Sequence, residues 1–149
     1  MRKLLLEKFS IFTKNNIMAM NKFDREYRYH HMGIPTTEIR PNEKFSEAFG
    51  MYTSDVEGDF RIQYHRFTED SPLHPLIKSL PHVAIQVDNL EEATDGYEIL
   101  LGPYEPIPNY RVAIINNGGV PVELIETSLT PSELWGRAKS QKDLDTSKL

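Results

Sequence analysis

Two short segments of this chain begin in the same way. HMGIP, starting at His31, and HVAIQ, starting at His82, both open with histidine, continue with an apolar and then a small residue, and place isoleucine fourth. The two openings lie 51 residues apart, and each is followed by a β-rich segment in which one polar residue interrupts an apolar run, Gln63 first and Glu123 second. Internal similarity of this kind indicates a duplicated unit. The sequence therefore predicts two modules, at about residues 28–68 and 80–128.

The sequence between residues 28 and 128 is rich in segments typical of β-strands, with alternating or β-branched residues. The sequence Asn-Asn-Gly-Gly at 116–119 predicts a tight hairpin, because glycine readily takes up the positive φ angles of such turns. Two segments favour helix, one after a Ser-Pro pair and one after Asp88 or Asn89. We expect an α+β domain with strands at 29–36, 45–53, 60–67, 82–87, 111–116 and 120–126 and helices at 71–79 and 89–101.

The composition excludes several classes of protein. The chain of 149 residues has 17 Lys and Arg against 22 Asp and Glu, a net charge of -5, so it has no excess of the basic residues that a general nucleic-acid binder needs. It contains no cysteine, which rules out disulfides, thiol nucleophiles and cysteine-ligated metal sites. No segment reaches the roughly 18 apolar residues of a membrane span. We expect a soluble, cytoplasmic protein that binds neither nucleic acid nor membranes.

The two ends of the chain differ from its middle. Residues 1–27 form a basic N-terminal segment, which we interpret as a leader or a short amphipathic arm. Residues 129–149 are interpreted as a polar C-terminal tail, since they end in a polar sequence without periodicity. The working domain is therefore expected at 28–128.

The paired openings HHMGIP and PHVAIQVDNLEEA, together with VPVELIE at the end of the second half, resemble the vicinal oxygen chelate (VOC) superfamily. This superfamily includes glyoxalase I, methylmalonyl-CoA epimerase, extradiol dioxygenases and bleomycin-resistance proteins. The resemblance covers about residues 28–128 and is closest to the epimerase-like branch. It implies paired βαβββ modules that form a curved, barrel-like mixed sheet around a divalent metal. It also implies a homodimer, with modules paired within one chain or between two.

The spacing between the histidine and the later polar residue differs between the two modules. Gln63 follows His31 by 32 residues, whereas Glu123 follows His82 by 41. We therefore expect the first module to have a reduced or missing helix.

The resemblance also implies a set of metal ligands. In the superfamily the first and last strands of each module point side chains at the metal, which places His31, Gln63, His82 and Glu123 around it. Two imidazoles, an amide oxygen and a carboxylate suit a divalent first-row ion (Zn, Co, Ni, Mn or Fe) and leave positions open for water or substrate.

Two ligand positions have alternatives. His30 replaces His31 if the strand register shifts by one residue, because such a shift exchanges the faces of a strand. His65 shares a strand face with Gln63 and is its rival. Side chains that could line a cavity and bind an anionic substrate are Tyr52, Tyr64, Tyr104, Tyr110 and Arg111.

The resemblance further implies a catalytic base at Glu47, which would abstract a proton next to a carbonyl group. We therefore expect an isomerase or lyase in which the ion stabilises an enediolate or chelates vicinal oxygens of a small substrate. One alternative is a metal-free protein that binds or sequesters a small molecule on the same fold. Another is an Fe(II) extradiol-type dioxygenase, because two histidines and a carboxylate form the triad of such enzymes.

Overall fold

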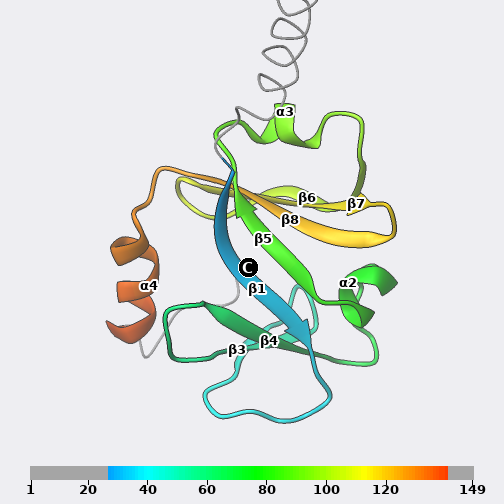
Figure 1. Cartoon of the computed structure of the whole chain (residues 1–149). Coiled ribbons are helices and arrows are strands. Elements are labelled where there is room, and N and C mark those ends of the chain that lie inside the picture. The colour runs from blue at the N-terminus through cyan, green and yellow to red at the C-terminus, as the bar shows by residue number, and fades with distance from the viewer. Residues whose placement is uncertain (1–26, 141–149) are drawn as a thin grey trace, which may run out of the picture.

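The computed structural model describes residues 27–140, and side chains as far as residue 135. Its strands form a single 8-stranded sheet, shown in Figure 1. The strands are β1 (Arg28–Pro35), β2 (Lys44–Ser46), β3 (Met51–Asp55), β4 (Ile62–Phe67), β5 (His82–Gln86), β6 (Glu98–Ile107), β7 (Tyr110–Asn117) and β8 (Val120–Thr127). The helices are α2 (Pro75–Ser79), α3 (Leu90–Thr94) and α4 (Pro131–Ser140). None of the helices in the described part is long and apolar enough to cross a membrane.

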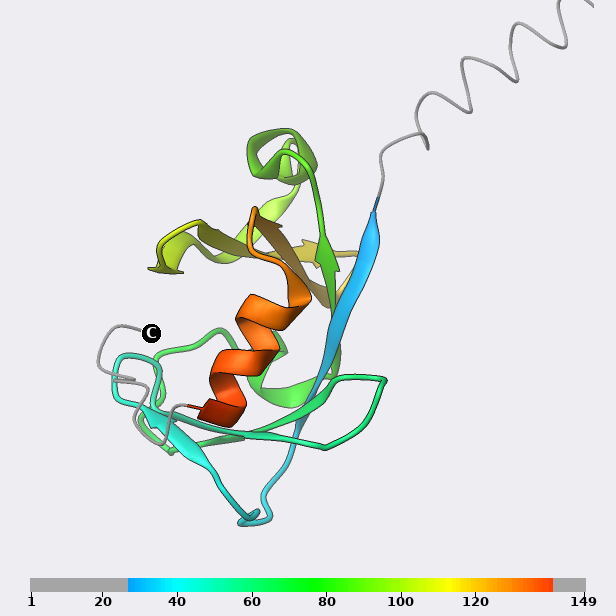
Figure 2. The same ribbon diagram turned by 90° about the vertical axis from the view of Figure 1, so that its left-hand side faces the viewer.

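The strand order, β2-β3-β4-β1-β5-β8-β7-β6, brings the two modules together at the centre of the sheet. β1 pairs in parallel with β4, β5 pairs in parallel with β8, and β1 and β5 are antiparallel neighbours. The strands that carry His31, Gln63, His82 and Glu123 therefore lie side by side, as predicted. This curled mixed sheet (Figure 2) confirms the predicted α+β fold of paired modules, and the two modules pair within one chain.

The helix content of the two modules also agrees with the sequence. No helix stands between β1 and β2, so the first module lacks one, as its short spacing predicted. In the second module α3 follows β5, and the Asn89 side chain caps it by accepting a hydrogen bond from the Glu92 backbone N–H. Leu90 and Ala93 of this helix are buried against the outer face of β7 and β8.

Three predicted elements differ in the structure. The predicted helix at 89–101 is wrong beyond residue 94, because Gly96 takes φ 79° and the chain then enters β6, which pairs with β7. The predicted strand at 45–53 is interrupted by a turn at 47–50. The predicted helix at 71–79 shortens to α2, whose N-cap is His74: its Nδ1 accepts from the Leu76 backbone N–H.

The predicted hairpin at 116–119 is confirmed. Asn117 of β7 pairs with Val120 of β8, and the two glycines between them take φ values of 66° and 91°. Because a side chain at such φ values is strained, glycine is the residue that suits this turn. The hairpin fixes the register of β8 against β7, and this register places Glu123 opposite Ile114.

Helix α4 was not predicted, since the sequence after residue 128 was interpreted as a tail. It follows β8 and crosses the open side of the curled sheet, between the half that contains β6 to β8 and the half that contains β3 and β4 (Figure 2). A signal for it is present in the sequence: Thr130 and Glu133 form a capping box, in which each side chain accepts a hydrogen bond from the other residue's backbone N–H.

Candidate metal centre

Three predicted ligands meet at the inner face of the sheet. His31 comes from β1, His82 from β5 and Glu123 from β8, and one ligand atom of each lies within 4.8 Å of the other two. Nε2 of His82 is 3.0 Å from Oε2 of Glu123, and Nε2 of His31 is 3.5 Å from the same oxygen. The side chains of His31 and His82 are 5% exposed and that of Glu123 is 13% exposed. The carboxylate therefore joins two buried imidazoles.

The charge of this carboxylate is stabilised by its neighbours. Burial would raise the pKa of Glu123, but the charges and hydrogen bonds of His31 and His82 outweigh it and hold that pKa well below its usual value. A buried carboxylate with two imidazole nitrogens is a donor set that divalent first-row metals bind. The residues present therefore fit an ion of this class.

Gln63 occupies the position of Glu123 in the other module. Glu123 pairs with Ala84, two residues after His82, and Gln63 pairs with Gly33, two residues after His31. Gln63 lines the same cavity as the three ligands. Its amide nitrogen donates a hydrogen bond of 2.8 Å to Asp55, which leaves its carbonyl oxygen, the atom that binds metals, without a hydrogen bond in the described part of the chain. Its role as a ligand stays a prediction.

A bulge in β1 affects both His30 and His31, the two alternatives for this ligand position. The register of β1 against β5 shifts between Tyr29 and His31, and this irregularity turns both histidines inward, so that each is only 4% exposed. Nδ1 of His30 lies 2.8 Å from Nδ1 of His31, so His30 contacts the back of His31. Burial lowers the pKa of His30 from 6.5 to about 4, which keeps the ring neutral at pH 7.

His65, the rival of Gln63, stacks on His82. The two ring centroids are 5.6 Å apart with an angle of 18° between the planes. Nδ1 of His65 is hydrogen-bonded to the Thr53 hydroxyl at 3.0 Å, while its Nε2 is buried without a partner among the described residues. Burial lowers the pKa of His65 to about 3. Its neutral ring thus supports the ring of His82.

Glu47 does not reach the site. It lies in the turn between β2 and β3, is exposed, and is not among the residues that line the cavity. Its backbone carbonyl accepts a hydrogen bond from the N–H of Gly50, which closes this turn. The strand that was predicted to carry Glu47 ends at Ser46, and the role of Glu47 as a base stays a prediction.

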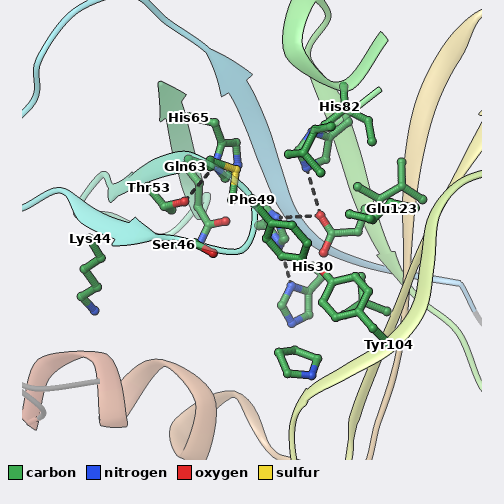
Figure 3. Close-up of a pocket in the computed structure, with 18 of the residues that line it drawn as sticks. His30, Lys44, Ser46, Phe49, Thr53, Gln63, His65, His82, Tyr104 and Glu123 are labelled. Atoms are coloured by element: carbon green, nitrogen blue, oxygen red, sulfur yellow. Dashed lines mark hydrogen bonds and ion pairs between the residues drawn. The ribbon is translucent and has the colours of Figure 1, made fainter. Parts of the chain in front are cut away.

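The cavity in front of the three ligands has a volume of about 280 Å³ and is shown in Figure 3. Its walls come from both modules, from α2 and from α4, and they are mainly apolar. Prominent apolar members are Phe49, Met51, Phe67, Leu73, Ile77, Leu101, Ile114 and Leu134. A cavity with mainly apolar walls and a few polar groups is typical of a small-molecule site.

Of the five side chains proposed to line a cavity, Tyr104 and Tyr110 do so. The others are not among its lining residues. The guanidinium of Arg66 lies over the Tyr52 ring, that of Arg40 over the Tyr64 ring, and Arg111 pairs with Glu91 and Glu126.

Trp135 is a lining residue that the sequence did not reveal. It projects from α4, and its ring lies 5.4 Å from His30 and 6.4 Å from His31 between centroids. Because α4 was taken as tail, its contribution to the cavity was missed.

Comparison with known proteins shows similarity of fold alone. No protein-family model matches the sequence, and no curated protein matches it. A solved structure of a hypothetical protein from Bacillus halodurans C-125 is similar, with a TM-score of 0.55, 19% identity, and coverage of 70% of this chain and 97% of that one. A methylmalonyl-CoA epimerase from Mycobacterium tuberculosis gives a TM-score of 0.48 and 19% identity, covering 68% of this chain and 88% of that one.

Proposed function

We propose that this protein is a metal-dependent enzyme that acts on a small substrate with vicinal oxygens, by proton transfer of the isomerase or lyase type. The observation that carries the proposal is the convergence of His31, His82 and Glu123 in the cavity wall, with ligand atoms within 4.8 Å of one another. A bound divalent ion supplies a Lewis acid there that polarises substrate oxygens. The metal's identity is open among Zn, Co, Ni, Mn and Fe.

The chain's own residues have separate tasks in this proposal. His31, His82 and Glu123 hold the ion, and Gln63 is its fourth ligand through the carbonyl oxygen that Asp55 leaves unpaired. The apolar walls hold the rest of the substrate and exclude water from it. The substrate proton passes to a group in the cavity lining in this proposal, and not to Glu47, which is exposed and outside the cavity.

The test combines metal content with solvent exchange. Protein purified without a tag is loaded with each ion, and deuterium incorporation from D₂O into small 2-oxo acids is followed by NMR. We expect the wild type to retain about one ion per chain and to catalyse exchange. Glu123→Gln should lose both properties, while Glu69→Gln, an exposed carboxylate in a loop, should keep them. A Glu123→Gln protein that retains a stoichiometric ion would contradict the ligand assignment.

A second candidate is an Fe(II) dioxygenase. The group of His31, His82 and Glu123 favours it, because two histidines and one carboxylate are the complete ligand set of such enzymes when Gln63 does not bind the ion. Such a set leaves room for a bidentate substrate and O₂. Oxygen uptake with iron and a catechol, without solvent exchange, would favour this candidate.

A metal-free binding protein is a third. It is favoured by the direct contacts of Glu123 with both histidines, which satisfy the carboxylate without an ion. Absence of exchange and oxygen uptake with every ion would favour it.

A further inference from the structure

Two buried nitrogen atoms next to the candidate metal centre have no hydrogen-bond partner among the described residues. They are Nε2 of His30 and Nε1 of Trp135. Both residues line the cavity, and their ring centroids are 5.4 Å apart. A buried polar atom without a partner is costly. A pair of them at a cavity wall therefore marks a place where a bound molecule supplies the missing partner.

The two nitrogens differ in what they can do. An indole nitrogen is always a donor, whereas an imidazole nitrogen is a donor or an acceptor according to the tautomer. The tautomer of His30 depends on His31, because their Nδ1 atoms are 2.8 Å apart and only one of them can donate the shared proton. The tautomer of His31 depends in turn on its own Nε2, which faces Glu123.

A metal ion bound to Nε2 of His31 fixes the direction of the hydrogen bond between His31 and His30. The ligated ring carries its proton on Nδ1, which donates to Nδ1 of His30. The neutral ring of His30 then carries its proton on Nε2. In the metal-loaded protein both unpartnered nitrogens are N–H donors.

Without an ion the direction is reversed. Nε2 of His31 lies 3.5 Å from Oε2 of Glu123, and a proton held there leaves Nδ1 of His31 as an acceptor. His30 then donates through Nδ1, and its Nε2 becomes an acceptor beside the indole donor. Metal binding thus changes the hydrogen-bonding character of the pair.

We propose that Nε2 of His30 and Nε1 of Trp135 bind a carboxylate oxygen of the substrate, in a state that metal binding at His31 sets up. This inference rests on the proposed function. His31 contacts Glu123 through Nε2 and His30 through Nδ1, which are opposite sides of its ring, and the His30 and His31 centroids are 5.1 Å apart. The bound oxygen therefore belongs to a second group of the substrate, separate from the vicinal oxygens at the ion.

Charge favours a carboxylate over a neutral carbonyl at this place. The guanidinium carbon of Arg61 lies 5.2 Å from the centroid of the Trp135 ring, and Lys44 lines the same cavity. Asp55 and Glu123 also line the cavity; the ion offsets the charge of Glu123, and Lys44 offsets that of Asp55, which accepts a hydrogen bond from Gln63. The substrate class is thus an acid with vicinal oxygens at one end and a carboxylate farther along.

The test uses NMR on the full ¹⁵N-labelled chain, metal-free and loaded with Zn²⁺, with zinc content measured first. The chain has one tryptophan, so its indole resonance reports Trp135 alone. The probes are 2-oxopentanedioate and 2-oxopentanoate, which differ only in the second carboxylate. We expect His30 to carry its proton on Nδ1 without zinc and on Nε2 with zinc. We also expect 2-oxopentanedioate to shift the indole resonance and to bind about tenfold more tightly than 2-oxopentanoate.

Substitutions separate this contact from general effects. Trp135→Phe should reduce the preference for the dicarboxylate to about twofold or less without changing zinc content. Tyr97→Phe, an aromatic substitution outside the cavity, should leave the preference unchanged. If Trp135→Phe does not fold, the tautomer of His30 and the shift of the indole resonance in the wild type still test the inference.

The inference is overturned, with the metal centre intact, if zinc binds but His30 keeps its proton on Nδ1, or if both probes bind equally. If no ion binds, the proposed function fails and this inference fails with it. Because zinc content is measured independently, the two failures are distinguishable.

Discussion

The imidazole ring of His82 lies against the backbone of Gly33 on the neighbouring strand. A Cβ added to Gly33 would be 2.1 Å from Cε1 and 2.5 Å from Nε2 of His82. No side chain fits into that space unless the ring moves. Gly33, the small residue two positions after His31, therefore has a structural role in the first module. It leaves room for His82, the proposed ligand from the second module.

Gly33→Ala should displace His82 from Glu123. We expect a loss of about 1 to 3 kcal/mol in the free energy of unfolding and at least about tenfold weaker zinc binding. Urea unfolding and zinc titration measure these two effects. In a His82→Ala background the clash is absent, so adding Gly33→Ala there should cost little stability. An equal cost in both backgrounds would show that the clash is not the cause.

Substitutions at Gln63 and His65 should distinguish these rival ligands. Gln63→Leu should weaken zinc binding about tenfold, because it removes the proposed fourth ligand. Asp55→Ala should have a smaller effect in the same direction, since Asp55 only orients the amide. His65→Gln serves as the comparison in the same zinc titration. If His65→Gln loses zinc and Gln63→Leu does not, the fourth ligand is His65 and not Gln63.

Glu47→Gln should change neither zinc affinity nor solvent exchange by more than about twofold, because an exposed residue outside the cavity does not contact the substrate. The measurement is deuterium incorporation at saturating substrate, with Glu123→Gln as the inactive reference. A large loss of exchange with unchanged zinc content would restore Glu47 as a base.

The ion pair between Glu43 and Arg66 should make stability depend on pH. Arg66 donates to both carboxylate oxygens of Glu43, at 3.0 and 2.7 Å, and these hydrogen bonds lower the pKa of Glu43. A lowered pKa means that the stabilisation is present above the ordinary value of 4.5 and is lost as the pH falls through the folded value.

A double-mutant cycle of Glu43→Gln and Arg66→Gln, read by thermal unfolding, measures this pair. We expect a positive coupling at pH 7 that is lost as the pH falls below 4.5 through the lowered pKa of Glu43. A coupling that is independent of pH would assign the effect to packing, for example of Arg66 on Tyr52, where the guanidinium carbon is 4.0 Å from the ring centroid.

The sequence alone determined the duplicated sheet and the hairpin. Alternation and turn residues are local signals, so the strands at His31, Gln63, His82 and Glu123 and the glycines of the β7–β8 turn could be predicted from neighbouring residues. The family resemblance then supplied the pairing of these strands, and the structure brings three of the four proposed ligands together.

Only the tertiary structure decided the rest. The bulge that turns both His30 and His31 inward arises from the pairing of β1 with β5, and the amide of Gln63 is oriented by Asp55 from β3. Residues 98–101 were predicted as helix but form β6 because β7 offers them hydrogen bonds. Trp135 enters the cavity only because α4 crosses the open sheet. Each of these features depends on a partner in another strand or helix, and the periodicity within one segment carries no information about such partners.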